Sequence, residues 1–277
     1  MKKWIAMLAF VLLCTGCSNT QPNQKTSVVY SNLMDSSSQK EVADSLERHG
    51  VTKQQTETLI SWANDFNSRI TSAAPSEGFR VMEQNSVDYS GLIVESKESK
   101  GEEPDPEANC RLTSYLLLKN FIQTNGTSAK DDTILMFDME AVEEYEPFRL
   151  SEKEKADFAS LFRWVPVKGC NTMEEHINAI QNAWADREIK IEGEGISLIC
   201  VYLHSTFDEV RFVGHTGVLV ETDTGLLFVE KYGPLYPFQA TKFHNREELK
   251  QYLLNRPDLY GDKTELAPII MENNQIL

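Results

Sequence analysis

The stretch Val210–Tyr232, VRFVGHTGVLVETDTGLLFVEKY, is the part of the chain that most clearly sets the fold. Two runs rich in β-branched and aromatic residues flank Asp223–Gly225, which has the composition of a tight turn. These runs, Val210–Glu221 and Leu226–Tyr232, are typical of paired strands. We therefore predict an antiparallel β-hairpin.

The register of this hairpin decides whether a histidine and a carboxylate meet. If a four-residue loop joins the strands, Glu221 pairs with Leu226 and Gly217 lies opposite Glu230. Residues two apart on a strand share a face, so Glu230 would then lie diagonally beside His215. A shift of one residue would send Glu230 to the other face, where it would only mark the point at which the strand reaches the surface.

The rest of the chain places helices before the hairpin and one after it. Capping-box spacings and apolar periodicity predict helices over 38–49 (Ser38 with Glu41), 52–70 (Thr52 with Gln55) and 111–123, with further helices beginning at Ser151 and Thr172 and a last one over 245–254. Another strand is expected at Ile196–Leu203 and an edge strand around Ile269. Leading helices and trailing strands predict an α+β domain over residues 28–277, with N-terminal helices packed on a C-terminal antiparallel sheet.

Cys110 directly precedes the apolar stretch Arg111–Ile122, which we expect to form a buried helix. A cysteine at a helix N-terminus feels the positive end of the helix dipole, which favours the nucleophilic thiolate. His215, in the segment Gly214–Gly217, could accept the thiol proton and return it to a leaving group. Glu230 could orient the imidazole as the third member of a triad.

The other cysteines have less distinctive surroundings. Five are encoded, of which Cys14 would leave with an export signal and Cys17 would carry lipid. Three remain, so at least one thiol stays free unless it pairs with another molecule. Cys200 lies in an apolar run and is expected to be buried and inert, while Cys170 is either inert or paired with Cys200.

The first seventeen residues predict export. Lys2 and Lys3 precede an apolar run, Trp4–Leu13, that is too short to span a bilayer. The segment ends in LCTGC, which resembles the bacterial lipoprotein cleavage box and implies that Cys17 is acylated, palmitate being a typical chain; the alternative is an ordinary secretory signal. Residues 18–27 would form a flexible tether, which places the domain on the extracytoplasmic face of the membrane.

Charge and motif content exclude several classes of ligand. The chain has 27 basic and 42 acidic residues, a net charge of −15 that becomes −17 when Lys2 and Lys3 leave with the signal. Nucleic acid is therefore not an expected partner. No metal or cofactor is expected, because zinc-ligand spacings are missing and the glycines of IEGEG (191–195) lack the Lys and Ser or Thr of a phosphate loop.

A cysteine at a helix start, followed by a strand carrying His-x-Gly and a second strand with a polar residue, resembles the papain-like cell-wall hydrolases of the NlpC and CHAP type. The resemblance covers Asn109–Ile122 and Gly214–Tyr232. It implies a papain-like fold, in which a cysteine helix packs on an antiparallel sheet, and the roles of nucleophile, base and orienting residue for Cys110, His215 and Glu230.

Two features depart from that pattern. The triplet Asn109-Cys110-Arg111 replaces the usual Asp-Cys-Ser, and the gap of 105 residues between Cys110 and His215 is long. Together with the LCTGC box, the segment Asn109–Thr113 also resembles a family of uncharacterised Gram-positive lipoproteins.

These observations lead to two hypotheses. The first is a lipid-anchored cysteine peptidase or amidase acting on cell-wall peptide or a surface polypeptide; acyl transfer between surface polymers would use the same residues. The second is a non-catalytic binding lipoprotein on the same scaffold. The aromatic and proline-rich segment Tyr232–Phe238 either lines a substrate groove or packs as a loop over the sheet.

Overall fold

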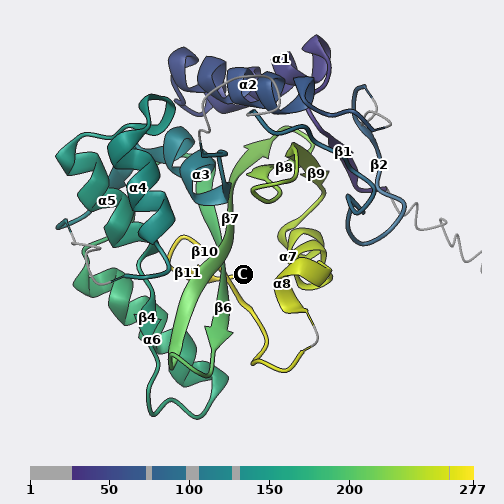
Figure 1. The fold of residues 1–277 in the computed structure, drawn as a ribbon. Coiled ribbons are helices and arrows are strands. Elements are labelled where there is room, and N and C mark those ends of the chain that lie inside the picture. Colours follow the sequence, from purple (N-terminus) through teal and green to yellow (C-terminus); the bar gives the residue numbers. More distant parts are fainter. Residues whose placement is uncertain (1–26, 73–76, 98–105, 127–131, 262) are drawn as a thin grey trace, which may run out of the picture.

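A central sheet, to which both ends of the described chain contribute, organises the fold (Figure 1). The computed structural model describes residues 27–72, 77–97, 106–126, 132–261 and 263–277. Within these residues the sheet has nine strands in the order β11-β10-β6-β7-β8-β9-β1-β2, with β4 also paired to β7. Neighbouring strands are antiparallel throughout. The predicted α+β class is confirmed.

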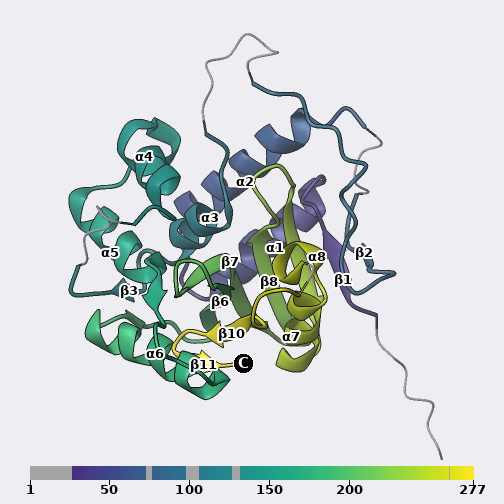
Figure 2. The same cartoon turned by 60° about the horizontal axis from the view of Figure 1, so that its bottom comes forward.

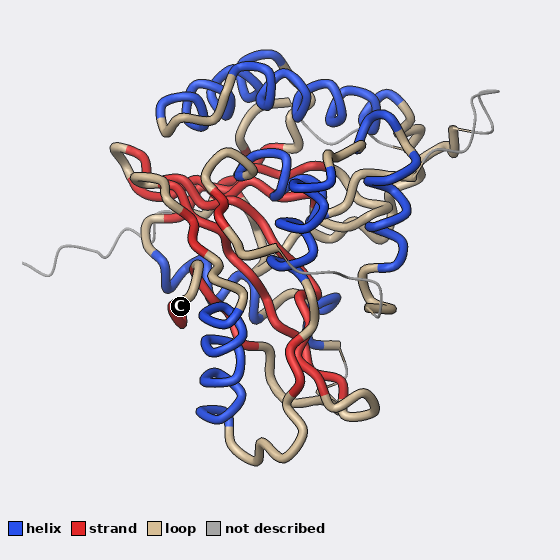
Figure 3. The backbone as a smooth tube through the Cα atoms, turned by 90° about the vertical axis from the view of Figure 1, so that its left-hand side faces the viewer, coloured by secondary structure: helices blue, strands red, loops and turns tan. Residues whose placement is uncertain are grey.

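The strands of this sheet differ widely in length. They are β1 (Val29–Ser31), β2 (Arg80–Val81), β4 (Val165–Pro166), β6 (Ile196–Ser205), β7 (Val210–Thr222), β8 (Gly225–Lys231), β9 (Phe238–Phe243), β10 (Ile269–Glu272) and β11 (Gln275–Ile276). Two short strands, β3 (Ile122–Gln123) and β5 (Lys190–Ile191), form a separate pair. The long central strands β6 and β7 run through the middle of the molecule, as the tube in Figure 3 shows.

Helices cover both faces of the sheet. They are α1 (Ser36–Arg48), α2 (Lys53–Ser68), α3 (Cys110–Leu118), α4 (Met136–Glu144), α5 (Glu152–Phe162), α6 (Met173–Asp186), α7 (Arg246–Leu254) and α8 (Pro257–Tyr260), with a short 3-10 helix η2 (Glu146–Phe148). In Figure 1, α3 to α6 lie to the left of β6 and β7, and α7 and α8 lie to the right. When the view is tilted, β10 and β11 are seen beside α6 (Figure 2), where Gln181 donates to the carbonyl of Asn274.

The alternation of side chains along β6 explains why the sheet has two apolar faces. Leu198 and Cys200 belong to the core shared with α1 to α6, whereas Ile199 and Val201 belong to the core shared with α7 and α8. Successive side chains on a strand point to opposite faces, so an unbroken apolar run such as that of β6 needs a helix layer on each side. The sequence predicted the layer of N-terminal helices. It also predicted the helix over 245–254, which is α7, but not that this helix and α8 cover the other face.

The hairpin register is as predicted. Glu221 pairs with Leu226, and the ladder continues to Val218 and Val229. Thr222 and Gly225 also pair, so the turn itself is tighter than the predicted loop. On the other side of β7 the pairing with β6 shifts by one residue at Gly214, between the pairs of Val201 with His215 and Tyr202 with Val213.

Helix starts follow the capping chemistry in most cases. Thr52, Ser151 and Thr172 each form the predicted capping box. The first helix is an exception, because its N-cap is Asp35, whose carboxylate accepts from two backbone amides, and Ser38 lies inside the helix. The prediction for Ser38 is therefore wrong by one turn.

Several elements differ from the prediction. The N-terminal strands β1 and β2, which join the sheet, were not predicted, and neither were the short elements β3, β4, β5, β11 and α8. The cysteine helix ends at Leu118 rather than near residue 123, and the chain there joins β3. Helix α4 was not predicted, and neither was β9, which lies between β8 and β1. The sequence of β9, FQATKF, hides its strand character because Gln239 and Thr241 are polar yet fully buried. The signal, the Cys17 box and the tether up to residue 26 lie outside the described residues.

Gly217 tests the packing of the hairpin. A β-carbon at this position would lie 2.4 Å from the Phe228 ring and 2.9 Å from the carbonyl oxygen of Val229. We expect Gly217→Ala to lower the free energy of unfolding by about 1–3 kcal/mol in urea denaturation, because the ring must move within a packed core. Gly91→Ala, where nothing lies within 4 Å, is the control and should change stability by less than about 0.5 kcal/mol. Equal stability of the two variants would contradict this account.

Candidate functional site

The structure brings Cys110, His215 and Glu230 together at the centre of the molecule. Cys110 is the first residue of α3, and this helix packs on β7 and β8, which carry the other two residues. His215 Nε2 donates to Glu230 Oε2 over 2.6 Å. The three residues are 7 %, 2 % and 0 % exposed, so their charges interact with little screening by water.

Cys110 and His215 lie close enough for each to change the ionisation of the other. Burial raises the pKa of the Cys110 thiol, but the hydrogen bond and charge of His215, with the charge of Arg111, outweigh burial and lower it overall. Burial and the charge of Arg256 lower the pKa of His215, but Cys110 and Glu230 outweigh them and raise it. Because Glu230 occupies Nε2, Nδ1 is the ring nitrogen left for the sulfur.

Hydrogen-bond donors surround the carboxylate of Glu230. Oε2 accepts from His215 and from Arg256 Nη1 at 2.5 Å, and Oε1 accepts from the Tyr252 hydroxyl at 2.6 Å, with Gln239 Nε2 at 3.5 Å. Burial raises the pKa of Glu230, but the charge of Arg256 and the bonds from His215 and Tyr252 lower it overall. The group is therefore held as an anion in the interior.

Both neighbours of Cys110 hold the start of α3 in place. Asn109 caps the helix by accepting from the Leu112 amide, and its Nδ2 donates to Asp138 Oδ1 over 2.5 Å. Arg111 donates to Asp138 Oδ2 from Nε and Nη2, at 3.0 and 2.7 Å, and its Nη1 donates to the carbonyl of Val213 over 2.8 Å. The side chain that follows Cys110 is thus tied to the backbone two residues before His215. Asn109 and Arg111, which differ from the usual Asp-Cys-Ser triplet, therefore both stabilise the start of α3.

Several of these residues were missed by the sequence analysis. Asp138 lies in a helix that was not predicted, and Tyr252 and Arg256 lie at the C-terminal end of the chain, far in sequence from the histidine. No spacing motif connects them to the hairpin. The only local signal is the pair Arg256 and Asp258, which bind each other two residues apart.

The remaining cysteines and histidines are placed elsewhere. Cys170 and Cys200 are both free, and burial raises the pKa of Cys200 to about 12. The other histidines bond to groups outside the Cys110 site: His49 to the carbonyls of Glu194 and Glu221, His176 to Arg211, His204 to Glu265 and His244 to Glu248. Within the described residues, no group of three or more His, Cys, Asp or Glu side chains is arranged to hold a metal ion.

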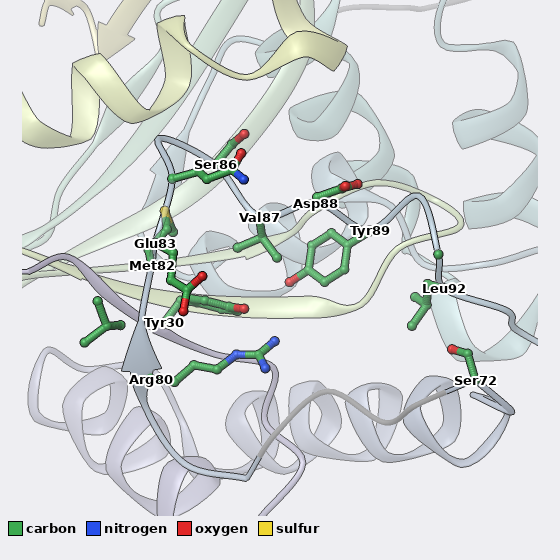
Figure 4. Close-up of a pocket in the computed structure, with 13 residues that line it drawn as sticks. Tyr30, Ser72, Arg80, Met82, Glu83, Ser86, Val87, Asp88, Tyr89 and Leu92 are labelled. Carbon is green, nitrogen blue, oxygen red and sulfur yellow. The ribbon is translucent and has the colours of Figure 1, made fainter.

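A cavity of about 510 Å³ opens beside this network, under the loop that follows β2 (Figure 4). Tyr30 and Arg80 line it together with Tyr89, whose hydroxyl donates to Gln239 Oε1 over 2.7 Å. Tyr89 also packs edge-on against Tyr232, with ring centroids 4.8 Å apart. Tyr232, the first residue of the aromatic segment Tyr232–Phe238, therefore packs against this loop. Through Gln239, Tyr89 connects the cavity wall to the carboxylate of Glu230.

Comparison with known proteins gives one family. The matching family model is a domain of unknown function (DUF4300), which covers residues 29–277. No curated protein and no solved structure matches the chain. No helix in the described part of the chain combines the length and apolar character needed to cross a membrane.

The bracing of α3 can be tested at Asp138. Asp138→Ala removes the partner of the largely buried Arg111, and we expect it to cost on the order of 3 kcal/mol of unfolding free energy in urea. Alkylation of Cys110 at neutral pH should also slow, because the thiol loses its fixed position against His215. The control is Asp44→Ala, which breaks an exposed pair with Lys40 and should cost less than about 1 kcal/mol. If both variants unfold at the same urea concentration, the brace has no stabilising role.

Proposed function

The chain belongs to this family, whose description assigns no activity, and we propose from the geometry of the site that it is a cysteine hydrolase. In this proposal Cys110 is the nucleophile, His215 the general base and acid, and Glu230 the orienting carboxylate. The bond cleaved is an amide.

One observation carries the proposal: a cysteine at a helix N-terminus lies beside a histidine whose far nitrogen donates to a fully buried glutamate at 2.6 Å. Structural histidines and cysteines seldom need such an arrangement. The lowered pKa of Cys110 and the raised pKa of His215 both favour the thiolate and imidazolium forms. A buried, unreactive thiol such as Cys200 shows the opposite shift.

The chemistry follows from these positions. The Cys110 sulfur attacks the carbonyl carbon of the amide, while the proton that it gave up is held on His215. His215 then delivers this proton to the leaving amine, the carbon–nitrogen bond breaks, and a thioester remains on Cys110. Water, deprotonated by His215, hydrolyses the thioester. The Cys110 backbone amide, in the first turn of α3, would bind the oxyanion.

The packing of α3 on β7 and β8 supports the papain-like architecture that the resemblance to NlpC and CHAP hydrolases implies. A cysteine helix seated on antiparallel strands that bear the base and the carboxylate is the arrangement expected of that group. The proposal therefore extends to the fold type of the catalytic unit. It also implies a substrate with a peptide or amide bond in the cell envelope.

The proposed location follows from the N-terminal segment. The LCTGC box favours acylation at Cys17 and release of the preceding residues, with residues 18–27 as a tether between lipid and domain. The hydrolase would then act on the outer side of the cell membrane, on cell-wall peptide or a surface polypeptide. The acidic domain adds no attraction to anionic lipid, so the acyl chains would provide the anchoring.

Thiol reactivity tests the proposal within a single sample. Iodoacetamide labelling followed by mass spectrometry, at pH values from 5 to 9, should modify Cys110 well below pH 8, because His215 and Arg111 favour its thiolate. Half-buried Cys170 serves as an internal reference, and Cys200 should remain unlabelled. His215→Ala should slow labelling of Cys110 by at least about tenfold at pH 6.5 and leave Cys170 unchanged.

Activity is the second measurement. Cleavage of cell-wall peptide by the intact protein should disappear in Cys110→Ala and fall by roughly 10²-fold or more in Glu230→Gln. If Cys110 labels no faster than Cys170 and does not respond to His215→Ala, the hydrolase is excluded. The chain would then be a binding lipoprotein on the same scaffold.

A further inference from the structure

Arg256 is a buried, charged residue beside His215 and Glu230, and the proposed mechanism assigns it no role. It lies between α7 and α8, on the sheet face opposite α3, and its side chain is fully buried. Its Nη1 lies 2.5 Å from Glu230 Oε2 and 3.1 Å from His215 Nε2. The guanidinium therefore contacts both the carboxylate and the imidazole.

We infer that Arg256 is a positioning residue that limits protonation of His215 by sharing the Glu230 carboxylate with it. This inference deepens the proposed function by naming what sets the charge state of its base. It rests on that proposal only for the role of His215 in catalysis, and the contacts themselves are independent of it.

The guanidinium is held so that it cannot turn away from the carboxylate. Nη2 donates to the carbonyl of Tyr232 over 2.8 Å and to Asp258 Oδ2 over 2.6 Å, and Nε donates to Asp258 Oδ1 over 3.2 Å. The guanidinium carbon also lies 3.6 Å from the centroid of the Tyr232 ring. A side chain fixed by four bonds and a ring contributes a constant charge at a constant distance.

The same oxygen of Glu230 accepts from Arg256 and from His215, and this sharing has an electrostatic consequence. In a triad without a cation, the full negative charge of the carboxylate stabilises the imidazolium. Here the arginine offsets that charge at nearly the same distance, so the imidazolium gains less from its carboxylate. Both Nη1 and a protonated Nε2 are donors, so the two can share the oxygen but cannot bond to each other.

The other groups around His215 do not perform this function. The titratable groups that reach His215 or its carboxylate are Cys110 from α3, Glu230 from β8 and Tyr252 from α7. Cys200 on β6 and Lys231 on β8 belong to the opposite face of the sheet. Among the causes resolved for the pKa of His215, Cys110 and Glu230 raise it, whereas burial and Arg256 lower it. Arg256 is thus the charged group among these causes that opposes protonation.

The catalytic consequence concerns the second proton transfer. A base that holds its proton too firmly is a poor acid for the leaving amine, and efficient transfer needs a pKa near the working pH. Arg256 lowers the proton affinity of the imidazole while fixing Glu230 in the position that orients it. The arrangement keeps His215 able both to take the thiol proton and to release it.

The test measures the titration of His215 in the folded chain by long-range ¹H–¹⁵N correlation of its histidine side chains, assigned with His215→Ala. Arg256→Met removes the charge and retains an apolar stem on Tyr232, and the pKa of His215 should rise by more than about one unit, because the offset of Glu230 is lost. Arg256→Lys keeps a positive charge and should leave the pKa within about half a unit of the unmodified protein. A purely structural role predicts that both variants behave alike, and no rise in Arg256→Met overturns the inference.

If Arg256→Met does not fold, a variant at the more exposed Asp258 tests the same inference, and the expected shift in the pKa of His215 has the opposite sign. Asp258→Asn removes the carboxylate that partly neutralises Arg256, so the pKa of His215 should fall. An unchanged or raised value would overturn the inference. These titrations do not need a substrate, so a chain that shifts as expected but cleaves no amide would refute the hydrolase and leave the role of Arg256 intact.

Discussion

The buried carboxylate of Glu230 is the constraint on which the centre of this structure depends. An isolated anion in a protein interior is strongly unfavourable, so it must be paired and fully hydrogen-bonded. Donors from three places in the sequence meet this need: His215 on the neighbouring strand, Tyr252 on α7 and Arg256 at the start of α8. The carboxylate therefore fixes how the C-terminal helices sit on the sheet as well as how the imidazole is oriented.

The next residue along β8 shows the same principle on the opposite face. Lys231 is fully buried, and its Nζ lies 3.6 Å from the centroid of the Phe66 ring and donates to the carbonyls of Pro234 and Tyr236. Burial lowers the pKa of this amine to about 7. Because side chains alternate along a strand, two adjacent charges serve two layers: Glu230 holds α7 and α8, and Lys231 holds the loop before β9 against α2.

Much of the fold and the core of the candidate site could be predicted from local patterns. Turn composition and strand alternation predicted the observed register of β7 and β8 as one of two alternatives, and in that register His215 and Glu230 were expected to meet. Capping boxes gave the starts of α2, α5 and α6. By contrast, β9 was missed because its polar residues, such as Gln239, are buried against partners that no local pattern reveals. Asp138 was missed with its helix α4, whose caps carry no side-chain hydrogen bond.

By itself the sequence determined the acidic balance, and it predicted the hairpin and the helix that begins at Cys110, since each of these two elements depends on neighbours within a few residues. Only the tertiary structure decided that the thiol meets the imidazole, because the 105 residues between them can be closed in many ways. It also decided the surroundings of the pair, where Asp138 braces the helix and Arg256 shares the carboxylate. The physical reason is that buried polar groups must find partners in space, and those partners carry no sequence spacing that could identify them beforehand.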